Sequence, residues 1–168
     1  MRNYKFFYCF LPYHMFLSVH SVAATTLAQS SLPTGMVFLL SFLSHFALDI
    51  IPHGDENILP KIKAKKHKIK SMITIAIIDS GVIFVSLLAL KKLGIEVLSW
   101  RILGAIFFAT LPDGLQFLEY VTDGKIKLIH IQQKLHRYIH NISGFTVPFW
   151  LGMIVQLLFF SAFILFLV

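Results

Sequence analysis

The residues best able to do chemistry are gathered in one short stretch, residues 41–56. There an apolar segment gives way to five ionisable side chains within twelve positions: His45, Asp49, His53, Asp55 and Glu56. His45 and Asp49 are four residues apart and therefore share one face of a helix. The Pro-His-Gly sequence that follows favours a bend, which can return His53 and Asp55 towards that face. This spacing predicts part of a metal site, and the alternative is a polar helix end wetted by lipid headgroups.

A second candidate is the pair His136 and His140, which are also four residues apart. On a helix, this spacing directs two imidazoles to the same side, as in helical metal-binding motifs. Taken alone, such a pair is more typical of a polar helix surface. His130 lies six positions before His136, on a different face, and is left out of the predicted site.

Two carboxylates occur inside apolar segments, where an unpaired charge costs several kcal/mol. Asp79 lies within 71–90, and Asp113 lies in a Leu-Pro-Asp-Gly sequence that predicts a break in the helix. For Asp79, the alternative to a metal is a structural hydrogen bond to a neighbouring helix. Counted from the expected membrane ends at 1.5 Å per residue, four groups lie roughly 9 to 13 Å deep in the same half of the bilayer: His20, His45, Asp79 and Asp113. Mixed His and Asp ligands suit zinc, manganese or iron.

The composition of the chain indicates a membrane protein. Of its 168 residues, 57% are hydrophobic and 14% are charged, and the mean hydropathy is +0.75. We expect one all-α integral membrane domain over 1–168, with one amphipathic helix at 123–142 and about five transmembrane helices: 12–28, 36–51, 71–90, 100–121 and 145–168. A cleaved signal peptide ending near Ala28 is the alternative interpretation of the first segment. The single cysteine excludes an intrachain disulfide.

The basic residues predict the orientation. Six of the fifteen Lys and Arg residues lie in 61–70, and twelve of the fifteen fall on one side of the expected membrane. Because cytoplasmic segments are enriched in Lys and Arg, we expect the N-terminus and the 52–70 loop to be cytoplasmic and the C-terminus to be external. Lysines placed between two spans favour anionic membrane lipid over nucleic acid as the partner.

Three motifs resemble those of a known family. Leu-Ser-His-Phe-Ala-Leu-Asp at 43–49, Leu-Pro-Asp at 111–113 and His-Arg-Tyr-Ile-His at 136–140 are similar to the motifs of the predicted inner-membrane metal-dependent hydrolases, a family with a LexA-regulated member. That family has an early histidine in its first helix, to which His20 is the nearest match. The resemblance implies a bacterial inner-membrane hydrolase. The residues and the resemblance together give the predicted metal ligands: His20, His45, Asp49, His53, Asp55, Asp79, Asp113, His136 and His140.

The expected function is metal-dependent hydrolysis at the cytoplasmic membrane face, on a phospholipid or another phosphoester. Glu56 or an unligated Asp could accept a proton, and Arg137 could hold a phosphate group. One alternative is a divalent-cation transporter, which would need a polar path to both faces. The other is a non-enzymatic membrane scaffold, whose polar residues would only join helices.

Overall fold

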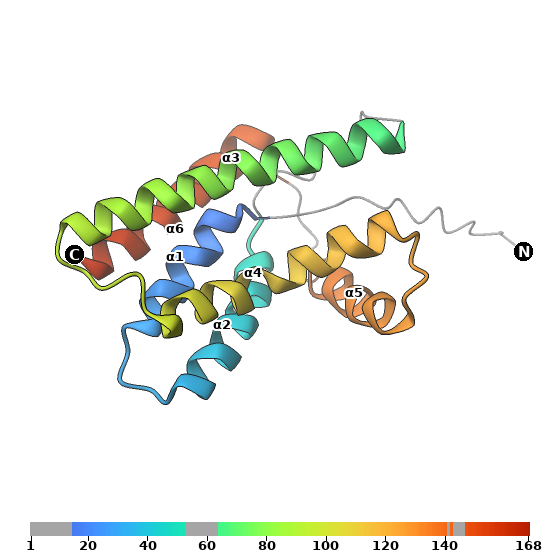
Figure 1. The fold of residues 1–168 in the computed structure, drawn as a ribbon. Helices are drawn as coiled ribbons and strands as arrows, with labels where there is room; N and C mark the ends of the chain where they lie inside the picture. The colour runs from blue at the N-terminus through green and yellow to red at the C-terminus, as the bar shows by residue number, and fades with distance from the viewer. Residues whose placement is uncertain (1–14, 53–63, 141, 143–146) are drawn as a thin grey trace, which may run out of the picture.

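The computed structural model describes residues 15–52, 64–140, 142 and 147–168, and for His140 the backbone alone. Within these ranges the chain forms six helices and no strand, which confirms the all-α prediction (Figure 1). The helices are α1 (Leu17–Ala28), α2 (Thr34–Asp49), α3 (Lys65–Lys92), α4 (Trp100–Val121), α5 (Lys127–His140) and α6 (Phe149–Leu167).

Three of the described helices, α3, α4 and α6, are long and apolar enough to cross a membrane. In α3 the apolar residues 71–90 lie between lysines and measure about 30 Å, the thickness of a bilayer's hydrocarbon core. The expected number of about five transmembrane helices is therefore not reached among the described residues. The two helices that fall short are α1, with 12 residues, and α2, with 16, whereas about 20 are needed to cross.

Two further expectations about helix boundaries are wrong. α3 begins at Lys65, so the end of the predicted 52–70 loop is helical, because lysine is a good helix former. The helix break predicted at Pro112 is absent, since α4 runs without interruption from Trp100 to Val121. Gln133 of α5 donates a hydrogen bond of 3.1 Å to the Pro112 carbonyl. The proline removes only the one intrahelical hydrogen bond that the Phe108 carbonyl would accept, and a helix can continue through such a position where it packs against protein.

The centre of the bundle is α1, which is buried on all sides and packs against α2, α3, α4 and α6. In Figure 1, α3 and α6 run in the same direction on one side of α1, and α2 and α4 lie on the other. The start of α1 is held by two long helices: Gln156 of α6 accepts a 2.7 Å hydrogen bond from the Phe16 N–H, and Asp79 of α3 accepts one of 3.1 Å from the Ser18 N–H. Since the first N–H groups of a helix lack intrahelical partners, these contacts let α1 begin inside the protein.

The turn between α1 and α2 is fixed by Arg101, at the start of α4. Its guanidinium donates to the carbonyls of Ala28, Ser30 and Leu32 at 2.7 to 2.9 Å. Nearby, Gly104 makes room for the Phe38 ring, because a Cβ atom at Gly104 would lie 2.6 Å from that ring. These contacts join α1, α2 and α4 into one unit, which contains one of the two apolar cores of the described residues.

α5 is amphipathic, and its polar face is turned inwards. Gln133 and His136 are fully or almost fully buried. Its large apolar side chains are instead on the outer surface: Leu128, Ile131, Leu135 and Tyr138. This arrangement is opposite to that of a helix on a soluble protein, and it suits a helix whose outer face meets lipid.

Candidate metal centre

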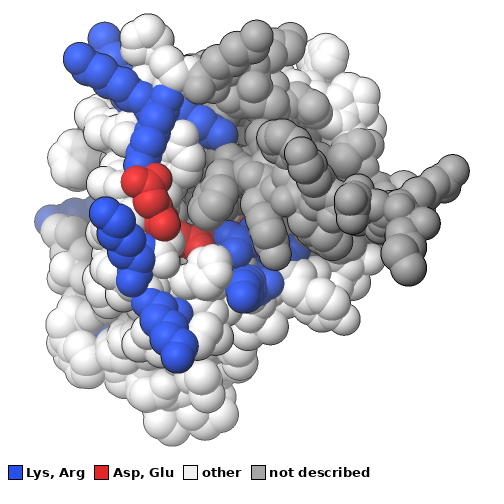
Figure 2. All heavy atoms as spheres, turned by 90° about the vertical axis from the view of Figure 1, so that its right-hand side faces the viewer, with Lys and Arg blue, Asp and Glu red and all other residues white. Residues whose placement is uncertain are grey.

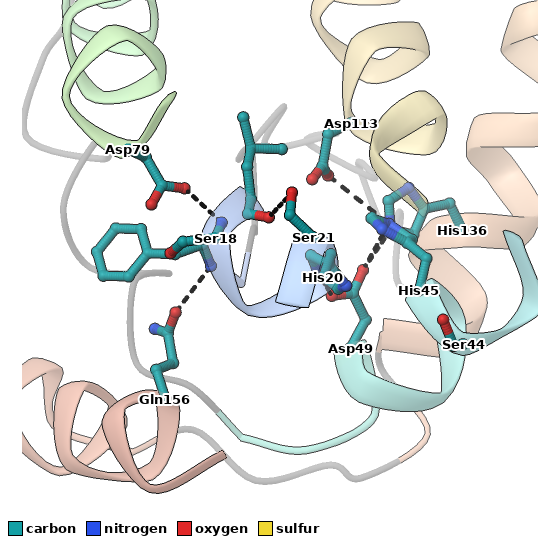
Figure 3. Close-up of polar contacts among 12 residues, drawn as sticks. Ser18, His20, Ser21, Ser44, His45, Asp49, Asp79, Asp113, His136 and Gln156 are labelled. Carbon is teal, nitrogen blue, oxygen red and sulfur yellow. Dashed lines mark hydrogen bonds and ion pairs between the residues drawn. The ribbon is translucent and has the colours of Figure 1, made fainter. Parts of the chain in front are cut away.

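Five ionisable side chains from four helices meet inside the bundle, and Figure 3 shows them pointing towards one another. They are His20 of α1, His45 and Asp49 of α2, Asp113 of α4 and His136 of α5. At most 7% of the surface of any of them is exposed. In such a low-dielectric environment each ionisable group requires a partner.

Asp49 lies at the middle of this cluster. Its Oδ2 atom is 2.8 Å from His136 Nε2 and 3.1 Å from His45 Nε2, and its Oδ1 atom is 3.3 Å from His20 Nε2. The Nε2 atoms of His45 and His136 are 3.4 Å apart. Asp113 Oδ1 lies 3.7 Å from His45 Nε2. One carboxylate is thus surrounded by three imidazoles, with a second carboxylate beside them.

These separations match those of donor atoms around one metal ion. When ligand atoms lie about 2.0 to 2.1 Å from a tetrahedral zinc ion, neighbouring ligand atoms are about 3.3 Å apart. The measured separations, from 2.8 to 3.7 Å, lie on both sides of this value. The donor set fits a divalent ion and could hold one, and its imidazoles and carboxylates suit zinc, manganese or iron.

Local sequence explains half of this geometry. His45 and Asp49 occupy successive turns on one face of α2, and the helix ends at Asp49, shortly before Pro52. Aromatic contacts then fix the imidazoles. The His20 and His45 rings are stacked with centroids 4.2 Å apart, and the Phe46 ring packs edge-on against both His45 and His136. Phe46 therefore gives the centre an apolar wall.

The position of His136 depends on how α5 is held against α4. Glu119 of α4 is 1% exposed and contacts two residues of α5. Its Oε1 atom is 2.7 Å from His130 Nδ1, and its Oε2 atom accepts a 2.9 Å hydrogen bond from Arg137 Nη1. Because Arg137 directly follows His136, this contact restrains the turn of α5 that supplies the imidazole.

Several predicted site residues have other positions. Asp79 binds the Ser18 N–H and belongs to neither donor group of the centre. Arg137, predicted to hold phosphate, donates to Glu119. The side chain of His140 lies outside what the structure describes, as do three whole residues: His53, Asp55 and Glu56.

Sequence reasoning missed three buried polar residues that organise the site. Glu119 and Gln133 fix α5, and Gln156 fixes the start of α1. The signal that could have found Glu119 is the one that identified Asp79, namely an acidic residue in an apolar helix. Gln133 and Gln156 carry no charge, so only the packing of the helices identifies them.

No family model, curated protein or solved structure matches the chain.

Proposed function

We propose that this chain is an integral membrane hydrolase that depends on a divalent metal ion held by His45, Asp49, Asp113 and His136. One observation carries the proposal: Asp49 Oδ2 and the Nε2 atoms of His45 and His136 lie within 2.8 to 3.4 Å of one another in a buried site. A hydrogen-bonded cluster without a metal would bury two carboxylates among three imidazoles. Without a metal, the carboxylates could remain charged only beside protonated imidazoles, and burying such ion pairs costs considerable free energy. A divalent cation would neutralise both carboxylates and remove this cost.

When bound, the metal ion would polarise a phosphoryl or acyl oxygen and lower the pKa of a water molecule. The protein's own residues would bind and orient that ion and exclude bulk water. Even Asp113, the most exposed of the proposed ligands, is only 7% exposed, so all four are shielded from bulk water. We assign Arg137 to holding α5 against Glu119, in place of the phosphate-binding role predicted from the sequence.

The surface around the centre favours an anionic lipid or another phosphoester as substrate. Figure 2 shows Lys and Arg side chains gathered on the end of the molecule where α3 begins and α5 lies. Lys65, Lys66 and Lys70 are exposed there. Lysines near a membrane surface attract anionic lipid by about 1 kcal/mol each. The outward apolar face of α5 would meet acyl chains and bring the headgroup near His136.

For the membrane arrangement, we propose that α3, α4 and α6 cross the bacterial inner membrane, with the lysine-rich end cytoplasmic. The pair α1 and α2 would lie within the bilayer among these helices, without either crossing its full thickness. Polar helix ends are tolerated at such a depth where they are buried in protein. Three hydrogen bonds to the backbone around α1 support this arrangement: Gln156 and Asp79 accept from N–H groups, and Arg101 donates to a carbonyl.

The test uses protein purified in detergent, stripped with a chelator and reloaded separately with zinc, manganese or ferrous iron. Its hydrolysis of p-nitrophenyl phosphate, bis-p-nitrophenyl phosphate and short-chain phosphatidic acid is then measured. We expect metal-dependent cleavage of at least one compound, lost in His45→Ala and Asp49→Ala. His67→Ala, at an exposed position on α3, is the control and should keep full activity. Metal binding without any cleavage, together with metal uptake by reconstituted vesicles, would favour the transporter instead.

A further inference from the structure

The centre contains more donors than one zinc-type ion uses. A catalytic zinc site has three protein ligands and one open position, whereas five donor side chains converge here. They form two groups, each with its ligand atoms within 4.8 Å of one another: His20 with His45 and Asp49, and His45 with Asp113 and His136. The two groups share His45, so His20 with Asp49 and Asp113 with His136 mark two adjacent places where a cation could bind.

Asp49 has the geometry of a ligand that bridges these positions. Its Oδ1 atom faces His20 at 3.3 Å, and its Oδ2 atom faces His136 and His45 at 2.8 and 3.1 Å. The two oxygens of this carboxylate are thus directed at different imidazoles. In sites with two metal ions the ions lie about 3.5 to 4 Å apart, a distance that one carboxylate can span by binding each ion through one oxygen.

His20 provides the second, independent observation. It is 0% exposed, its Nδ1 atom has no hydrogen-bond partner among the described residues, and its Nε2 atom has only the 3.3 Å contact with Asp49 Oδ1. Its ring stacks on His45 and its Nε2 atom faces Asp49. A buried imidazole with so few polar contacts is unfavourable, and a metal ion bound to the Nε2 atom would supply a strong one.

We propose that the centre holds two divalent cations bridged by Asp49, one on the side of His45, Asp113 and His136 and the other on the side of His20. This inference rests on the proposed metal-dependent hydrolase and specifies its substrate further. Two divalent ions and two aspartates leave an excess of two positive charges. Such an excess favours a phosphoester whose two oxygens can each face one ion, as in two-metal phosphoesterases.

The decisive experiment loads the purified, chelator-stripped protein with manganese and removes unbound metal by gel filtration. Elemental analysis should give two manganese ions per chain for the wild type and one for His20→Ala. Electron paramagnetic resonance should show the multiline signal of two exchange-coupled manganese ions in the wild type. In His20→Ala this signal should be replaced by the six-line signal of an isolated ion. His67→Ala should remain like the wild type in both measurements.

A single manganese ion per chain in the wild type, or an uncoupled signal at full loading, would overturn the inference. The wild-type spectrum answers this question even if His20→Ala fails to fold, and His20→Gln offers a second variant of similar size. The two proposals can also fail separately. One ion per chain together with phosphoester cleavage would contradict only the second cation. Two coupled ions without cleavage of any compound in the substrate panel would contradict only the proposed hydrolase activity.

Discussion

Asp79, in the middle of α3, accepts a hydrogen bond of 3.1 Å from the backbone N–H of Ser18, at the start of α1. A side chain of one apolar helix thus caps the end of another inside the protein. His20 lies two residues beyond Ser18 in the same helix. The capping contact therefore helps to fix where α1 begins. It thereby also helps to fix the position of the His20 imidazole along the helix axis, opposite Asp49.

The first prediction separates capping from metal ligation by Asp79. Asp79→Leu should lower the free energy of unfolding by about 1 to 3 kcal/mol, because it leaves a buried N–H without an acceptor. Asp79→Asn keeps an acceptor oxygen and should cost less than about 1 kcal/mol. Thermal unfolding in detergent measures both changes. The metal content at saturating metal should stay at the wild-type value in Asp79→Asn, and a lower content in that folded variant would show that Asp79 is a ligand.

The second prediction concerns Arg101, which binds three carbonyls around the α1–α2 turn. Arg101→Met should destabilise the protein by about 1.5 to 3 kcal/mol, the range for hydrogen bonds that involve a charged group. Arg101→Lys should recover only part of this loss, because an ammonium lacks the planar fork that reaches several carbonyls. Lys92→Met, at an exposed position in α3, is the control and should change stability by less than about 0.5 kcal/mol. Equal stability of Arg101→Met and the control would exclude this role.

The residues of the proposed centre were predictable from the sequence where their spacing is local. His45 and Asp49 share a helix face whatever surrounds them, and the cost of a charge in an apolar segment identified Asp113 and Asp79 alike. Sequence could not decide which of these two aspartates reaches the centre. That depends on the rotation of α3 and α4 about their axes, which is set by packing between helices.

The number of membrane-crossing helices could not be predicted for a related reason. α1 contains no Lys, Arg, Asp or Glu, as is usual for a transmembrane helix, but here protein and not lipid surrounds it on every side. Its start is defined by Gln156 and Asp79, which are distant in sequence. In contrast, the lysines on both sides of 71–90 are a local signal, and α3 has the length and apolar character that they indicated.

The third prediction tests how α5 is positioned. Glu119→Ala should weaken metal binding about tenfold, the lower end of the effect of groups that support metal ligands, because Arg137 and His130 both lose their contact on α4. The metal dissociation constant, measured by competition with a chromogenic chelator, reports the change. Lys134→Ala alters an exposed residue of the same helix and should leave the constant unchanged. An unaltered constant in folded Glu119→Ala would mean that α5 is held by other contacts.

The fourth prediction concerns orientation. In Figure 1 the C-terminus lies at the end of the molecule where α3 ends, opposite the lysines at the start of α3. Because the lysine-rich end is expected to be cytoplasmic, alkaline phosphatase fused after Val168 should be active. A cytoplasmic reporter fused at the same position should be inactive. The reverse pattern would invert the proposed topology and place the lysine-rich surface outside the cell.

The central claim is that the buried imidazoles and carboxylates hold a divalent metal ion, and X-ray absorption at the metal edge tests it most directly. For zinc-loaded protein we predict nitrogen and oxygen ligands at about 2.0 to 2.2 Å and no sulfur, with the scattering pattern of at least two imidazoles. In His45→Ala the imidazole contribution should fall while the protein remains folded. Protein that retains no metal after gel filtration, or a bound ion whose spectrum contains no imidazole, would contradict the proposed centre.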